Sequence, residues 1–185
     1  MNVSGGSEIS AEGFVGLPPT EEDLEGLVGL FSDSRVVATL GGARTPLQVR
    51  EILARWQALW RDRGLGPWIL RHPSSGVFLG YAGVAMASAG RPGEVELLYA
   101  LLPQFWGGGI ATRASTSAID FVFADETQKG SITELIAYAL VDNKASRGVI
   151  EKLGFAYERQ IEHAGWPHAF YRLTREAWSA GRRGI

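Results

Sequence analysis

The sequence predicts an α/β (α+β) fold with a mixed, mostly antiparallel central sheet of about six to seven strands, flanked by about four helices. Two observations predict it. In the first half of the chain, helical spacing of apolar residues gives way to short runs joined by tight turns, a pattern typical of antiparallel strands. Later, a strand, a long amphipathic helix and another apolar strand follow one another, and such a crossover makes the two strands parallel.

Length and composition fit one domain. The chain has 185 residues, 45% of them hydrophobic, so it can bury one substantial core but is short for two full domains. Its first residues are polar and include glycine. We therefore expect a flexible N-terminal end at residues 1–11, a single domain at residues 12–178 and a C-terminal tail at residues 179–185.

Charge and residue content exclude several classes of partner. The net charge is -2 and no long basic run occurs, so we expect no nucleic acid. The absence of cysteine excludes disulfides and thiolate chemistry, and His163 and His168 have no spaced carboxylate partners, so we expect no metal. The N-terminus lacks a basic region followed by an apolar core, and no apolar run approaches the roughly 20 residues that cross a bilayer, so we expect a cytoplasmic protein without membrane contact. Monomer and homodimer both remain open.

The first two helices are marked by their caps. The stretch from Thr20 to Asp23 resembles a capping box, and apolar residues follow it at helical spacing. Thr45 is another N-cap, with Pro46 at the first helical position, and the second helix is predicted to run to about Arg63.

Along the chain, the strands predicted for the first half come before and after these two helices. Residues 12–17 are a weak strand candidate, and residues 68–71 and 77–84 are predicted to form a hairpin. Residues 94–102 form the next strand, which leads into a glycine-rich turn.

The second half is predicted to contain a crossover and a closing hairpin. A helix starting at Ile110 ends near Asp125, and the apolar run at residues 134–141 suits a strand covered on both faces. A further helix begins at Asn143, a good N-cap, and ends at Gly154. The chain then closes with a hairpin, whose strands are residues 155–161 and 169–173.

The glycine-rich turn is the candidate ligand site. From Gln104 to Thr112 the sequence reads Gln-Phe-Trp-Gly-Gly-Gly-Ile-Ala-Thr. The first amides of a helix lack internal partners, and glycines allow an anion to approach them, which favours a phosphate cradle. No Lys-Ser/Thr pair follows, and the Gly-x-Gly-x-x-Gly spacing is absent, so the turn is neither a Walker loop nor a dinucleotide fingerprint. A flexible turn is the alternative interpretation; the flanking strand and helix favour the cradle.

Two motifs resemble one family. The spacing Gln-x-x-Gly-x-Gly-x-Ala, from Gln104 to Ala111, resembles the pyrophosphate-binding motif of the GCN5-related N-acetyltransferase (GNAT) superfamily, whose members hold coenzyme A there. Residues 143–155 are similar to the Asn-x-x-Ser…Glu-Lys-Leu-Gly-Phe signature of its RimJ/RimL-type branch, which includes ribosomal-protein alanine acetyltransferases. The resemblance runs from about Thr20 to Trp178, although the first strand departs from the Thr-Glu-Arg-Leu-x-Leu-Arg pattern usual in that branch.

The resemblance implies a GNAT fold that binds acetyl-CoA as co-substrate. Its sheet is splayed between the fourth and fifth strands, here residues 94–102 and 134–141, and the pantetheine arm enters the gap. The cofactor-binding residues that the resemblance implies are Leu101, Leu102, Gln104, Gly107, Gly108, Gly109, Ile110, Ala111, Thr112 and Asn143.

The reaction that the resemblance implies is acetyl transfer to a primary amine, either a protein N-terminus or a small-molecule amine, by direct attack in a ternary complex. An α-amine has a pKa of roughly 8 and a lysine amine roughly 10, so the amine must first lose a proton. Glu96 is the candidate base, with Glu94 on the same strand face or an ordered water as alternatives. Ile150 stands where many members have a tyrosine, and Ser146 matches the serine that the resembled branch carries, so Ser146 is the candidate proton donor to the thiolate; a hydroxyl bonded within its helix is the alternative.

The acceptor side is less defined. Candidates for its lining are Tyr99, Trp166, His168 and Tyr171, for which a core or rim role is the alternative. A non-catalytic acyl-CoA-binding or sensing module of the same fold is the alternative function, and a nucleotide-binding α/β protein is a weaker one.

Overall fold

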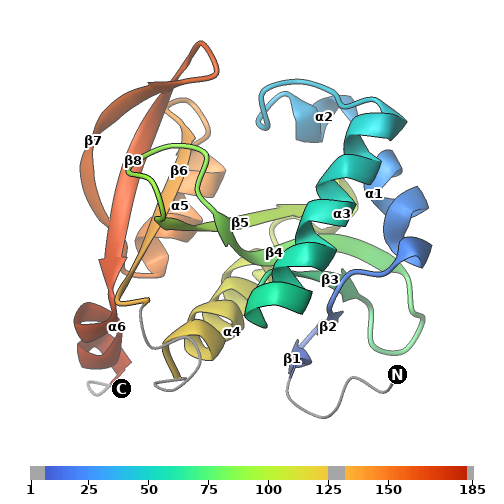
Figure 1. Ribbon diagram of the computed structural model, residues 1–185, viewed down its shortest axis with the longest axis horizontal. Helices are drawn as coiled ribbons and strands as arrows, with labels where there is room; N and C mark the ends of the chain where they lie inside the picture. The colour runs from blue at the N-terminus through green and yellow to red at the C-terminus, as the bar shows by residue number, and fades with distance from the viewer. Residues whose placement is uncertain (1–6, 125–131, 183–185) are drawn as a thin grey trace.

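The computed structural model describes residues 7–124 and 132–182, which form an eight-stranded sheet with helices on both faces (Figure 1). The strands are β1 (Ile9–Ala11), β2 (Phe14–Leu17), β3 (Pro67–Arg71), β4 (Phe78–Met86), β5 (Val95–Leu101), β6 (Glu134–Leu140), β7 (Ala156–His163) and β8 (Trp166–Thr174). Their order is β1-β2-β3-β4-β5-β6-β8-β7, and only β5 and β6 are parallel neighbours. The predicted fold class is confirmed.

The strand count differs at the N-terminal end. One strand was predicted at residues 12–17, but β1 and β2 form a hairpin whose turn contains Gly13 with a positive φ of 90°. Residues 1–6 of the expected flexible end lie outside the described residues, whereas Ile9–Ala11 belong to the sheet.

The helical segments are η1 (Glu21–Asp23), α1 (Leu24–Leu30), α2 (Ser34–Val37), α3 (Pro46–Arg63), η2 (Pro103–Phe105), α4 (Ile110–Ala124), α5 (Lys144–Lys152) and α6 (Arg175–Arg182). Cap chemistry explains the bounds of α3. The Thr45 hydroxyl accepts from the Gln48 N–H, the Gln48 side chain accepts from the Thr45 N–H, and Gly64 ends the helix in the left-handed region.

The predicted helices correspond to α1, α3, α4 and α5, and two others were missed. Of these, α2 spans a single turn, too short to show a helical period. The other, α6, continues to Arg182, into the stretch expected to be a tail. The predicted end of α4 near Asp125 and residues 183–185 lie outside the described residues.

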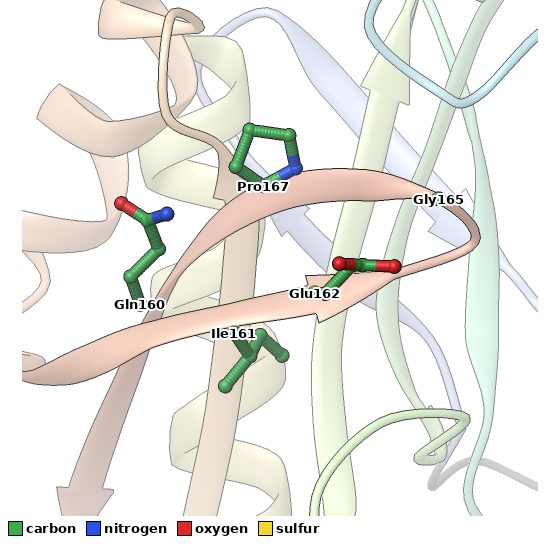
Figure 2. A pocket seen from close by; sticks show the side chains of 5 residues that line it. All are labelled: Gln160, Ile161, Glu162, Gly165 and Pro167. Atoms are coloured by element: carbon green, nitrogen blue, oxygen red, sulfur yellow. The ribbon is translucent and has the colours of Figure 1, made fainter.

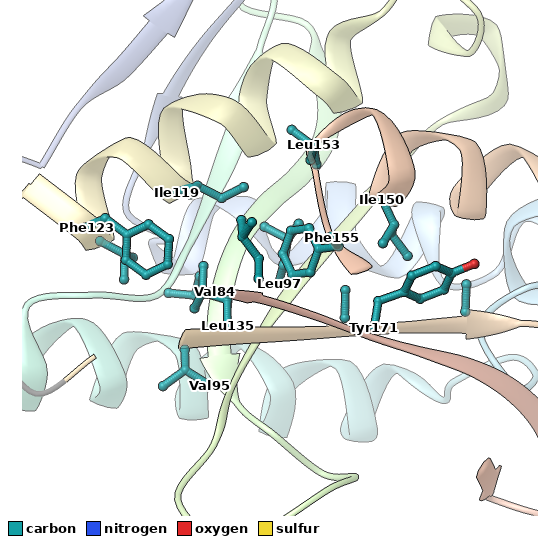
Figure 3. Close-up of a cluster of buried hydrophobic side chains, with 14 of the residues drawn as sticks. Val84, Val95, Leu97, Ile119, Phe123, Leu135, Ile150, Leu153, Phe155 and Tyr171 are labelled. Carbon is teal, nitrogen blue, oxygen red and sulfur yellow. The ribbon is translucent and has the colours of Figure 1, made fainter. Parts of the chain in front are cut away.

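The two faces of the sheet carry separate cores. Side chains of α1, α2 and α3 pack on one face, where Leu27, Val36 and Leu53 meet Tyr81 of β4. On the other face α4 and α5 pack against β5, β6 and β8 (Figure 3). We call these the α3 face and the α4 face. No helix in the described ranges has the length and hydropathy to cross a membrane.

The sheet is splayed between β5 and β6. Registered pairs between β4 and β5 run from Gly80↔Leu101 to Met86↔Val95, but β5 and β6 have a single one, Glu96↔Ile136. Beyond Glu96, therefore, β5 has no strand partner on its β6 side. The predicted splay lies between these two strands.

Candidate active site

The open edge of β5 presents backbone groups to the gap. The Leu102 N–H donates to the Leu79 carbonyl oxygen at 2.8 Å, and the Leu102 carbonyl accepts from the Phe105 N–H at 2.9 Å. Backbone groups of successive strand residues point to opposite edges, so those of Tyr99 and Leu101 point into the gap. In contrast to the prediction, the Leu102 backbone groups are already paired, and the Leu101 carbonyl oxygen accepts from the Trp106 indole, so the Tyr99 backbone groups and the Leu101 N–H are those that face the gap.

The glycine turn has the geometry of an anion cradle. Gly107 and Gly109 have positive φ angles of 79° and 75°, and a Cβ on Gly107 or Gly108 would point into open space. The first backbone hydrogen bond of α4 runs from the Arg113 N–H to the Gly109 carbonyl at 3.0 Å. The backbone N–H groups of Ile110, Ala111 and Thr112, which precede Arg113, therefore have no acceptor inside the helix. Unpaired N–H groups of this kind are what an anion needs in order to bind.

Arg113 is a feature of this turn that the sequence analysis missed. Its guanidinium folds back over Gly109, with Nη1 only 2.9 Å from where a Cβ of that residue would lie. Its Nε donates to the Glu12 carbonyl oxygen at 3.0 Å, which fixes the side chain there. A positive charge thus stands beside the amides. The sequence signal that could have identified Arg113 is a basic residue one helical turn after the glycines.

Gln104 and Trp106 lie on opposite sides of η2. The Trp106 indole N–H donates to the Leu101 carbonyl oxygen at 2.7 Å and so ties the turn to the end of β5. Gln104 instead lines a shallow groove of about 430 Å³ together with Glu25 of α1 and Phe78 of β4. The structure does not place the Gln104 side chain with the free amides.

Glu96 lies where the β5–β6 pairing ends. Its Oε2 is buried and has no hydrogen-bond partner among the residues that the structure describes. Burial raises the pKa of Glu96, and the smaller opposing effects of the Tyr138 hydroxyl and the Ser88 backbone do not cancel it. A desolvated carboxylate without a cation is a strong proton acceptor.

Glu94, the alternative base, is already neutralised by arginines. Its carboxylate accepts from the Arg91 N–H at 2.6 Å and from the Arg172 guanidinium at 2.8 Å. Burial raises the pKa of Glu94, but the hydrogen bonds from Arg91 and Arg172 outweigh it and lower the pKa overall. Arg172 also binds Glu134 and Glu158, so Glu94, just before β5, belongs to an ion network that reaches β6, β7 and β8.

These opposite shifts predict opposite effects on stability. The raised pKa of Glu96 means that its contribution is most favourable below the pKa of the unfolded chain and is lost as pH rises through the folded pKa. The lowered pKa of Glu94 means that its stabilising contribution is present above its pKa in the unfolded chain and is lost as pH falls through its pKa in the folded protein. We expect Glu96→Gln to raise Tm at about pH 8 and Glu94→Gln to lower it, with both differences shrinking towards about pH 4, as measured by thermal unfolding. Shifts of the same sign would contradict this picture.

Ser146 lies across the gap from Tyr99. Asn143 caps α5 by accepting from the Ser146 N–H at 3.1 Å, as its sequence position predicted. The Tyr99 hydroxyl lies 2.8 Å from Ser146 Oγ and donates to the Ser146 carbonyl oxygen at 2.9 Å. Burial raises the pKa of Tyr99 to about 12, although the Ser146 hydrogen bond lowers it, so Tyr99 stays protonated. The Ser146 hydroxyl is therefore linked to β5 and not only to its own helix.

The other expected acceptor-side residues are spread over both faces. Tyr171 is fully buried in the α4-face core, and its hydroxyl pairs with Arg147 at 2.9 Å and Glu151 at 3.0 Å, so it does not line an acceptor site. Trp166 is 57% exposed at the β7–β8 hairpin. That hairpin has a shallow depression of about 210 Å³, lined by Gln160, Ile161, Glu162, Gly165 and Pro167 (Figure 2), which contains none of the predicted site residues.

Tyr138 is the second residue that the sequence analysis missed. Its hydroxyl lies 2.9 Å from Ser88 Oγ, and its ring contacts those of His163 and His168, at centroid distances of 5.2 and 5.7 Å. His168 thus packs beside Tyr138, next to Glu96. In the described ranges no group of three or more His, Asp or Glu side chains is arranged to hold a metal ion.

Comparisons with known proteins agree with this geometry. The family model of the acetyltransferase (GNAT) domain matches residues 17–156. The chain is 31% identical to the Bacillus subtilis (strain 168) protein YkkB over 142 residues, covering 77% of this chain and 80% of that protein.

Solved structures share the fold. The Vibrio fischeri ribosomal-protein-S5-alanine acetyltransferase superposes with a TM-score of 0.75 at 16% identity, covering 92% of this chain and 98% of that one. The aminoglycoside acetyltransferase AAC(6')-Ib, solved in complex with coenzyme A, superposes with a TM-score of 0.71 at 21% identity, covering 88% and 95%.

The chain belongs to the GNAT acetyltransferase family. It is an acetyl-CoA-dependent N-acetyltransferase.

Proposed function

We propose that the protein transfers the acetyl group of acetyl-CoA to a primary amine, either a protein N-terminus or a small-molecule amine, by direct attack in a ternary complex. The observation that carries this proposal is the buried, unpartnered Oε2 of Glu96 where the β5–β6 pairing ends. A protonated amine is the partner that such a carboxylate lacks.

The co-substrate is held by backbone groups in this proposal. The amides of residues 107–112 and the α4 dipole bind the pyrophosphate, with Arg113 adding charge beside them. The pantetheine arm lies in the gap, where the backbone groups of Tyr99 and the Leu101 N–H bind it in place of the missing strand partner. Asn143 acts indirectly, by capping α5 and so fixing Ser146.

Glu96 and Ser146 handle the two protons of the reaction. Glu96 takes a proton from the amine, directly or through water, and its raised pKa brings it closer to that of the amine. Ser146 donates a proton to the departing thiolate and regains one from water, while the hydroxyl of Tyr99, 2.8 Å from Ser146 Oγ, holds the serine side chain in place. The two groups lie on opposite sides of β5, one towards each face of the sheet.

An acceptor screen tests the proposal. Acetyl-CoA is incubated with peptides of varied N-terminal residue, including alanine, with spermidine and with kanamycin, and the released thiol is measured. The alanine peptide and kanamycin represent the acceptors of two structural neighbours, the ribosomal-protein-S5-alanine acetyltransferase and the aminoglycoside acetyltransferase, and spermidine adds a polyamine. Thiol release with at least one amine, lost in Glu96→Gln, supports the proposal; release that is equally fast without any amine contradicts it.

Replacing Ser146 with alanine is expected to lower kcat by about tenfold or more while leaving CoA affinity nearly unchanged, because a proton donor acts on the leaving group and not on the bound ground state. The measurement is single-turnover kinetics together with CoA binding. Tyr99→Phe, which removes the hydroxyl hydrogen-bonded to Ser146, is the paired variant, and the two effects should be less than additive. Full turnover in Ser146→Ala would assign the donor elsewhere.

A further inference from the structure

The Tyr138 hydroxyl interacts with the Glu96 carboxylate. Ile136 of β6 is registered with Glu96, and Tyr138 lies two residues further along, so its side chain is on the same face. On the far side of this hydroxyl, Ser88 in the β4–β5 loop is exposed, and its Oγ lies 2.9 Å away. The side chains of Glu96, Tyr138 and Ser88 therefore follow one another from the buried carboxylate to the surface.

Charge and packing hold this arrangement in place. Burial raises the pKa of Tyr138, and the neighbouring Glu96 raises it further, so the hydroxyl keeps its proton in the resting protein. The ring is packed against His163 and His168, which leaves little freedom for the hydroxyl. The other ionisable groups that face this pair are Tyr81 of β4, which feels the Glu96 charge, and Arg44, which faces Tyr81.

We propose that Tyr138 positions Glu96 and carries the proton that Glu96 takes from the acceptor amine to Ser88 and then to solvent. The inference rests on the proposed role of Glu96 as base. The amine N–H bond breaks and its proton bonds to Glu96. Glu96 then passes a proton to the Tyr138 oxygen while Tyr138 gives its own to Ser88 Oγ, and Ser88 gives its own to water. Every group returns to its starting form, and no further reactant is needed.

The positioning role is tested without any acceptor. The side-chain carboxyl of Glu96 is titrated by ¹³C NMR in the wild type, with Glu96→Gln identifying its signal, and again in Tyr138→Phe. The variant keeps the ring but loses a hydroxyl that lowers the pKa of Glu96, so the pKa should rise by about one pH unit. Tyr157→Phe, on an exposed tyrosine of β7, is the matched control and should leave it unchanged. An unaltered Glu96 titration in Tyr138→Phe overturns the positioning role.

The relay is tested with the fastest amine among the alanine peptide, spermidine and kanamycin. Ser88→Ala should lower kcat several-fold in dilute buffer and recover at high buffer concentration, because a buffer molecule accepts the proton at the exposed end. Ser75→Ala, another exposed turn serine, should show no buffer dependence. A Ser88→Ala rate equal to the wild type in dilute buffer overturns the relay. If Glu96→Gln itself stays fully active, the base assignment has failed instead, so the two failures are distinguishable.

Discussion

Glu96→Gln is expected to lower kcat/KM by about a hundredfold, the usual contribution of a positioned general base. The loss should be greatest between the pKa of Glu96 and that of the amine, where the carboxylate is ionised and the amine still carries its proton. Shape and acetyl-CoA affinity should persist, because glutamine fills the same space and Glu96 lies on the α3 face, away from the glycine turn. The measurement is a pH profile of kcat/KM for the variant against the wild type.

Glu94→Gln is the matched control for that result. It makes the same chemical change two residues away, in a carboxylate bound by Arg91 and Arg172. We expect lower stability but nearly normal turnover in the folded protein. Matching profiles for the wild type and Glu96→Gln would leave Glu96 without a chemical role, and a loss confined to Glu94→Gln would move the base to Glu94.

Saturating acetyl-CoA is expected to stabilise the fold by about 2.7 kcal/mol when it is a hundredfold above its dissociation constant. Gly109→Val should remove most of this gain. A β-branched residue is strained at a φ of 75°, and its Cβ would lie 2.9 Å from Arg113 Nη1, which displaces both the turn and the cation. The readout is the shift of Tm with ligand.

Gly29→Ala is the control for the glycine substitution. Gly29 lies in α1 with no atom within 4 Å of an added Cβ and no positive φ, so alanine fits there. It should keep the full ligand-induced shift. No shift in the wild type with saturating acetyl-CoA would contradict the cradle, and a full shift in Gly109→Val would show that the turn is not the binding element.

Local signals in the sequence were sufficient for many of the elements. The capping box of Thr45 and Gln48 and the C-terminal Gly64 fix α3, and the run from Gln104 to Thr112 indicates the cradle. Elements of three or four residues, such as β1 and α2, are too short to show a period and depend on tertiary pairing.

The chemistry of the site was predictable only in part. The parity of β5 placed Glu94 and Glu96 on one face, but it does not distinguish them. The distinction comes from Arg172, which lies 78 residues from Glu94 along the chain and reaches it only in the folded sheet. Tyr138 was missed for the same reason, since the register of β6 against β5 decides that it faces Glu96.

The single registered pair between β5 and β6 has a mechanical consequence. Apart from this one registered pair, the two parts of the sheet, β1 to β5 and β6 to β8, depend on side chains to stay together. Side chains connect the two parts on both faces. Arg172 bridges Glu94 and Glu134 on one face, and Leu97 packs with Leu135 in a shared core on the other. The rigidity of this connection is therefore determined by side chains, which can be substituted without changing the backbone of either part of the sheet.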